Sequence, residues 1–169
     1  MTITELMVAG SLMLMVMGAM LTLFSGVQRT SVRESARSQA GDAVRISMER
    51  ITRDVRQSTR ICPTSDGSRL DFDTYVNGVP RRVVYAVAGD SLTRQTGTGA
   101  FASCGTLTAS NSSSRVFAER LVSTTVFTYD PDVESATAVA ITLRVRPENY
   151  RNDNVTIELT SEAQLRNGG

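Results

Sequence analysis

The chain has 169 residues, of which 41% are hydrophobic, and a formal net charge of +1. It contains no histidine, lysine or tryptophan, so all 18 basic residues are arginines. Without histidine or lysine, most general-base and Schiff-base chemistry is excluded, and a zinc site is disfavoured. There is no P-loop, dinucleotide turn or nucleophile elbow, and the arginines are interspersed with acids. We therefore expect no enzymatic activity, no cofactor or metal, and no specific nucleic-acid binding.

Residues 1–28 form a hydrophobic segment that carries one charged side chain, Glu5. The 23 uncharged residues 6–28 would make a helix of about 35 Å, which is long enough to cross a bilayer. A carboxylate at the edge of such a span is costly unless it is paired, and the nearest cation is the α-amino group of Met1, of this chain or a neighbouring copy. Two ordinary roles compete. The helix macrodipole favours an acid in the first turn, and Glu5 could reach water at the membrane edge.

The basic residues and the cysteines predict opposite orientations. Arg29, Arg33 and Arg37 follow the span and no basic residue precedes it, which would hold the remainder of the chain in the cytoplasm. Cys62 and Cys104 instead favour a disulfide in an oxidising compartment, the alternative being two unrelated buried thiols. The bond would close 41 intervening residues and stabilise the fold by ~4 kcal/mol. A basic leader that once preceded Met1 and was then removed would reconcile the two.

Residues 29–61 predict the amphipathic second half of the same helix. Val44, Met48, Ile51 and Val55 follow a 4-3-4 spacing on one face. We expect one helix over residues 2–60, about 90 Å long, which ends before Cys62-Pro63. This half carries eight arginines against four acids. They could pair with the mildly acidic remainder of a neighbouring subunit, or form i,i+4 pairs such as Glu49–Arg53.

Residues 62–169 predict a β-rich head. Asn77-Gly78 indicates a hairpin between strands at 69–76 and 83–87, and Gly89-Asp90 a turn into 91–94. Residues 96–114 are rich in Gly, Ser and Thr and are typical of a long loop. Further strands are expected at 121–129, 138–146 and 154–165. The predicted fold class is therefore α+β, with a long N-terminal helix packed against a C-terminal antiparallel β-sheet domain.

Acidic clusters suggest one alternative site. Asp71 and Asp73 alternate on one strand, while Asp130, Asp132 and Glu134 surround a turn. Alternating carboxylates can bind calcium, but turn chemistry explains the second cluster equally well.

The segment Met1-Thr2-Ile3-Thr4-Glu5-Leu6-Met7-Val8 resembles the mature N-terminus of type IV pilins and pseudopilins. Met1 replaces the usual phenylalanine, Thr4 replaces an aliphatic residue, and Thr22 stands where major pilins often have a helix-breaking proline. The segments 91–94, 126–129 and 165–167 are similar to those of the minor pilin and minor pseudopilin branch. The resemblance covers the first 25 or so residues best.

This resemblance implies a structural subunit of a type IV pilus or pilus-like filament. A prepilin peptidase would cleave the leader and Met1 would be N-methylated. The chain would wait as a single-pass protein in the cytoplasmic membrane until an assembly platform and its ATPase extract it into an extracellular fibre of pilins. Glu5 would pair with the Met1 amino group of an adjacent subunit, and any local melting of the helix in the fibre is expected at Gly18.

Two alternatives stay open. The chain could be a minor pseudopilin of a type II secretion system, or a membrane-anchored extracellular binding module that does not polymerise, with its ligand site in the loop 96–114.

Overall fold

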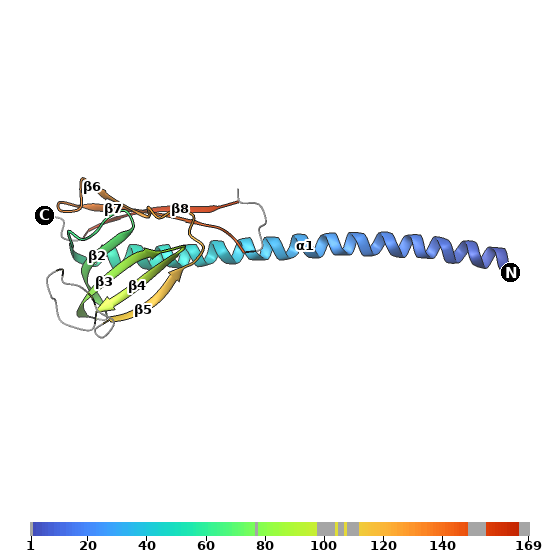
Figure 1. Cartoon of the computed structure of the whole chain (residues 1–169), viewed down its shortest axis with the longest axis horizontal. Coiled ribbons are helices and arrows are strands. Elements are labelled where there is room, and N and C mark those ends of the chain that lie inside the picture. Colours follow the sequence, from blue (N-terminus) through green and yellow to red (C-terminus); the bar gives the residue numbers. More distant parts are fainter. Residues whose placement is uncertain are drawn as a thin grey trace.

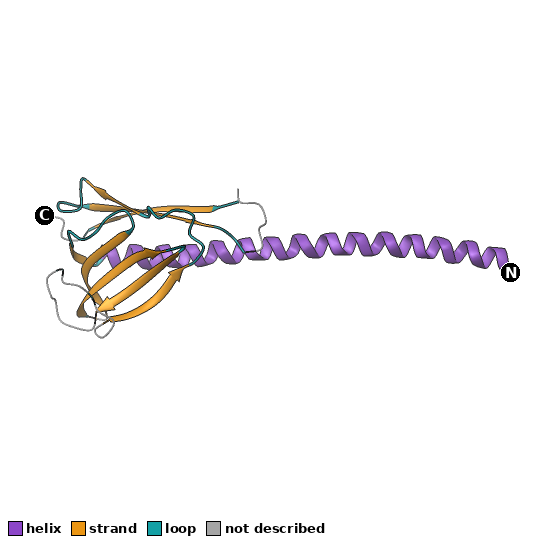
Figure 2. Ribbon diagram, in the orientation of Figure 1, coloured by secondary structure: helices purple, strands orange, loops and turns teal. Residues whose placement is uncertain are grey.

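The computed structural model describes residues 2–76, 78–97, 104, 107, 112–148 and 155–165. One helix, α1 (Ile3–Arg56), extends far beyond a head built of strands, and the strands surround only its C-terminal part (Figures 1 and 2). The strands in the described residues are β1 (Ser58–Ile61), β2 (Arg69–Val76), β3 (Val79–Ala88), β4 (Ser91–Gly97), β5 (Ser112–Ala118), β6 (Phe127–Asp130), β7 (Ala138–Val145) and β8 (Ile157–Gln164). The predicted α+β fold class is confirmed.

The strands form two antiparallel sheets within the expected β-sheet domain. One sheet has the order β1-β2-β3-β4-β5 and the other β6-β7-β8. A single bridge between Leu121 and Val145 links the segment after β5 to the end of β7. The chain therefore meanders within each sheet, while the two sheets cover different sides of the same helix.

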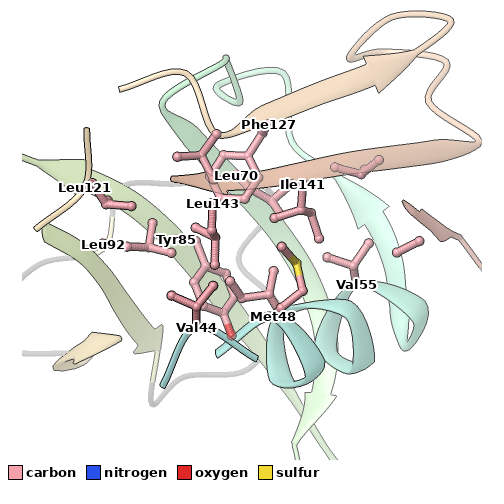
Figure 3. Close-up of a cluster of buried hydrophobic side chains, with 14 of the residues drawn as sticks. Val44, Met48, Val55, Leu70, Tyr85, Leu92, Leu121, Phe127, Ile141 and Leu143 are labelled. Carbon is pink, nitrogen blue, oxygen red and sulfur yellow. The ribbon is translucent and has the colours of Figure 1, made fainter. Parts of the chain in front are cut away.

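The core lies where α1 meets the two sheets. Val44, Met48, Ile51 and Val55 are each at most 4% exposed, so the predicted apolar stripe is the buried face of the helix. Figure 3 shows side chains of the helix directed toward residues of both sheets. The buried sheet residues of this cluster are Leu70, Phe72, Val83, Tyr85, Leu92, Leu121, Val126, Phe127, Val139, Ile141, Leu143, Val145 and Ala163.

The helix ends earlier than the sequence indicated. α1 stops at Arg56, and residues 58–61 form β1, which pairs with β2 through Ser58↔Thr74 and Ile61↔Phe72. The expected helix over residues 2–60 was therefore wrong at its C-terminal end. Tertiary contacts override the helical tendency of these residues. Residues 58–61 gain hydrogen bonds to β2, and Ser58 becomes buried.

Both predicted tight turns are confirmed. Val76 pairs with Val79 and Ala88 with Ser91, which leaves two residues in each turn. Gly78 has φ +77° and Gly89 has φ +64°, conformations that a residue without Cβ adopts at low cost. Asn77 lies outside the described residues.

The predicted loop over residues 96–114 was too long at both ends. β4 continues to Gly97, which pairs with Ser112 at the start of β5. Sequence patterning missed β5 because its serines are poor strand formers, whereas pairing with β4 supplies the ladder that propensity does not. The strand expected over residues 121–129 is shorter, with only residues from Phe127 onward in β6.

A disulfide joins Cys62 to Cys104, as the sequence predicted. Cys62 is fully buried at the end of β1, and its N–H donates to the carbonyl of Asp71 in β2. The bond ties the segment between β4 and β5 to the opposite edge of the five-stranded sheet. The loop that the disulfide closes therefore contains β2, β3 and β4, with the β2-β3 and β3-β4 pairings between them.

Replacing both cysteines by serine should lower the free energy of unfolding of the head by ~4 kcal/mol, because the unfolded chain regains the entropy of the closed loop. Denaturant titration of the full chain in detergent micelles, with and without reductant, would measure this loss. Reductant should have no further effect on the double variant. A loss below about 1 kcal/mol would contradict a stabilising role.

Candidate functional site

The N-terminal half of α1 has no partner within the chain. Each described side chain from Thr2 to Gln28 is exposed, whereas the same helix is buried from Val44 onward on its apolar face. More than half of the surface is exposed in each of these large hydrophobic residues: Ile3, Leu6, Met7, Val8, Leu12, Met13, Leu14, Met15, Val16, Met17, Met20, Leu21, Leu23, Phe24 and Val27. An apolar surface of this extent on a water-soluble molecule marks a membrane or protein contact.

This half of the helix is long and apolar enough to span a bilayer. A window of 18 residues reaches a mean hydropathy of 2.1 with none of it buried by the head. The exposure excludes the ordinary soluble explanation of such a helix, which is that it forms a protein core. The candidate functional surface is therefore the whole circumference of residues 3–28.

Glu5 is satisfied within its own helix turn. Its carboxylate accepts hydrogen bonds from the N–H of Thr2 at 3.0 Å and from the Thr2 hydroxyl at 3.3 Å. Because Thr2 precedes the first turn, its N–H is one of the donors that a helix leaves unpaired. The ordinary role of an acid at a helix N-terminus is thus present in the isolated chain. Met1 lies outside the described residues, so its pairing with Glu5 of a neighbour stays a prediction.

The helix is continuous through Gly18 and Thr22. A side chain at Gly18 would meet no atom within 4 Å, and the Thr22 hydroxyl donates to the carbonyl of Ala19 at 2.8 Å. Threonine also keeps the backbone N–H that proline lacks, so the helical hydrogen bonds can continue at this position. Melting at Gly18 within a fibre stays a prediction.

The other end of α1 is anchored by a polar cluster around Asp54. One oxygen of its carboxylate, Oδ2, accepts the Tyr85 hydroxyl at 2.8 Å and Arg94 Nη2 at 2.9 Å. The Arg94 guanidinium also lies 5.9 Å from the centre of the Tyr85 ring. Burial, followed by the Asp54 charge, raises the pKa of Tyr85, so the hydroxyl keeps its proton and remains a donor. This cluster fixes the helix to β3 and β4.

Two further hydrogen bonds hold the helix between the sheets. The Ser47 hydroxyl donates to the carbonyl of Phe117 in β5 at 2.7 Å, and the Thr52 hydroxyl lies 3.4 Å from that of Ser161 in β8. The exposed half therefore projects from a head in which both sheets contact residues 44–55 of the helix.

Two of the acids considered for calcium, Asp71 and Asp132, have other partners. Asp71 is fully buried and accepts two hydrogen bonds from Arg82 and one from Arg69. Asp132 accepts the Ser135 N–H at 2.8 Å, which is the turn chemistry considered as the alternative. Within the described ranges, no three acidic, cysteine or histidine side chains gather as a metal site.

Asp73 is a buried acid with an incomplete set of partners. It is 4% exposed, and its Oδ1 has no hydrogen-bond partner in the described part of the chain. Burial raises the pKa of this carboxyl, while the nearby Arg82 opposes the shift. Asp73 is therefore a local cost to the folded state at neutral pH.

The loop 96–114, suggested as a ligand site, lies mostly outside the described residues.

Comparisons of the chain with family models, curated proteins and solved structures give no match. The function must therefore be inferred from the residues and geometry of this chain.

Asp54→Ala should destabilise the head by about 2–3 kcal/mol, because it leaves the Tyr85 hydroxyl and the Arg94 guanidinium without their shared acceptor. Glu49→Ala is the matched control on the same helix, since Glu49 pairs with Arg53 at the surface and should contribute under about 1 kcal/mol. Denaturant unfolding of both variants would compare them. Equal losses would contradict the anchoring role of Asp54.

Asp73→Asn should stabilise the head at neutral pH and have no effect below about pH 3. The sign follows from the raised pKa of Asp73. The folded state favours the protonated acid, so the wild-type unfolding free energy falls as pH rises from the ordinary pKa of 3.8 through the raised one. Unfolding free energies of both proteins across this range would test it. An asparagine variant less stable at neutral pH would refute it.

Proposed function

We propose that this chain is a structural subunit of a type IV pilus or pilus-like filament. The observation that carries the proposal is the contrast along α1, which is exposed and apolar over residues 3–28 and anchored to a folded head over residues 44–55. A membrane would cover the apolar half before assembly, and the same halves of neighbouring subunits would cover it afterward. The resemblance of residues 1–8 to the mature N-terminus of pilins supports the same conclusion.

The disulfide supports the compartment that belongs to this proposal. Cys62–Cys104 favours an oxidising environment for the head, with the apolar half of α1 in the cytoplasmic membrane until assembly. A prepilin peptidase, an assembly platform and an ATPase are the partners that this route requires. The same proposal includes ion pairs between subunits, in which the arginine-rich stalk (residues 29–61) of one subunit pairs with the acidic head of the next. Within one chain, the stalk already forms the predicted i,i+4 pair between Glu49 and Arg53 at 2.8 Å.

Glu5 would set the axial register of the subunits. A buried ion pair contributes little net stability but strongly penalises arrangements that leave one charge unpaired. In the isolated chain Glu5 accepts the N–H of Thr2. In the fibre it would accept the Met1 ammonium group of an adjacent subunit.

Glu5→Ala should leave membrane insertion unchanged and reduce the yield of sheared fibres by about tenfold or more, because misregistered and correct contacts then differ less in energy. Glu5→Gln separates the two roles of the side chain, since it can still accept the Thr2 N–H but carries no charge. It should assemble as poorly as Glu5→Ala. Glu34→Ala, an exposed acid farther along α1, is the control.

The proposal fails if Glu5→Ala gives normal fibre yield, or if sheared fibres of the wild-type cells lack this chain. Complete absence would favour the anchored binding module. Trace amounts would assign a minor subunit, and bulk amounts a major one.

A further inference from the structure

In the part of the chain that the structure describes, the three-stranded sheet ends in an open strand edge at β8. β8 is the last strand in the order β6-β7-β8. The Leu165 N–H donates to Thr137 at 2.9 Å on the β7 side, and Leu143 lies opposite Leu159. Main-chain groups of alternate residues point to opposite sides of an antiparallel strand. The N–H and C=O groups of Glu158, Thr160 and Glu162 therefore point away from β7, to the free edge.

A groove lies beside this edge, between β8 and α1. It has a volume of about 730 Å3, with Met48 and Thr52 on the helix side and Leu159, Thr160 and Ser161 on the strand side. Figure 1 shows β8 running alongside the C-terminal part of the helix. A further strand added to the sheet would lie in this groove, about 4.8 Å from β8. Its inward side chains would then contact the helix.

The helix wall of the groove is basic. It carries Arg45, Arg53, Arg56 and Glu49. Glu49 pairs with Arg53 at 2.8 Å, whereas Arg45 and Arg56 have no acidic partner in the described part of the chain. Two guanidinium groups are thus left to face whatever occupies the position beside β8. Carboxylate side chains match them in charge and geometry.

A second copy of the chain is a poor occupant. Antiparallel pairing of two β8 edges about Thr160 would place Glu158 opposite Glu162 of the other copy, and like charges directly opposite are destabilising. Pairing with the β5 edge would bring Arg115 toward the arginines of the groove. The edges of β1 and β6 offer only four residues each.

We propose that the β8 edge binds an extended acidic segment of a partner protein as a fourth strand of this sheet. Its main chain pairs with Glu158, Thr160 and Glu162. Carboxylates at alternate positions face Arg45 and Arg56, and an apolar side chain between them packs on Met48 and Leu159. Strand addition of this kind derives affinity from the main chain and specificity from alternate side chains. The docking site goes beyond filament assembly and does not depend on it.

The test uses the full chain in detergent micelles and a labelled peptide that has threonine at every second position, with glutamate and valine alternating between. Fluorescence anisotropy should show saturable binding that Arg45→Glu/Arg56→Glu weakens by about tenfold or more. Arg33→Glu/Arg50→Glu reverses two exposed arginines of the same helix that do not line the groove, and should leave affinity unchanged. The same peptide with lysine in place of glutamate should not bind.

Main-chain pairing is tested separately by amide hydrogen exchange. The peptide should slow exchange at Thr160 and Glu162 by about tenfold or more, because their N–H groups become hydrogen-bonded. Thr160→Pro removes one edge donor without removing a bond to β7, and should abolish binding, whereas Thr160→Ala should not.

No binding of the acidic peptide, equal binding of the lysine peptide, or binding without added protection at β8 would each overturn the proposal. Self-association of the chain that Thr160→Pro abolishes would assign the edge to a second copy and overturn it as well.

Discussion

The attachment of α1 to the head depends on the carboxylate of Asp54. One oxygen of this side chain accepts hydrogen bonds from both Tyr85 and Arg94, and these residues belong to neighbouring strands. The apolar stripe alone would let the helix slide or rotate, because hydrophobic contact is not directional. The charged acceptor contributes a directional contact that helps to fix the axial position of the helix. Asp54 lies in the last turn of α1, and together with the hydrogen bonds of Ser47 and Thr52 it sets the orientation of the projecting half.

Sequence patterning predicted those parts of the fold that are determined locally. The apolar stripe at 44–55 and the turns at Gly78 and Gly89 each depend on spacing or on a single residue type, and all were found. β1 was missed because it has only four residues directly after the helix, and β5 because it begins with three serines; both are strands through pairing with β2 and β4. The division into two sheets likewise depends on which strands pair, and no local signal encodes that choice.

The polar clusters were harder to predict than the apolar ones. Asp54 lies between Ile51 and Val55 in sequence, at the border of the apolar stripe, which is a weak signal of a buried role. Asp71 was considered as a calcium ligand because acids alternate at 71 and 73, yet Arg82 neutralises it from the adjacent strand. An arginine and a metal ion satisfy the same carboxylate, so the sequence of one strand cannot distinguish them. The pairing register of β2 and β3 decides the partner of Asp71, because it places Arg82 beside this carboxylate.

Glu5 illustrates how one side chain can serve two states in the proposed filament. Before assembly, its hydrogen bond from the Thr2 N–H compensates part of the cost of placing a carboxylate at the edge of the bilayer. In a fibre the Met1 ammonium group of a neighbour would offer the same carboxylate a charged donor, and a charge-assisted bond is stronger than a neutral one. The free energy gained per subunit on assembly is therefore the difference between the Thr2 hydrogen bond and the Met1 ion pair. This difference is small, because both arrangements satisfy the carboxylate. A subunit displaced along the axis would keep the Thr2 bond but leave an ammonium group unpaired in an apolar core, and this penalty on the wrong register is larger than the gain in the right one. In the proposed filament, Glu5 thus acts on the accuracy of assembly more than on the strength of the fibre.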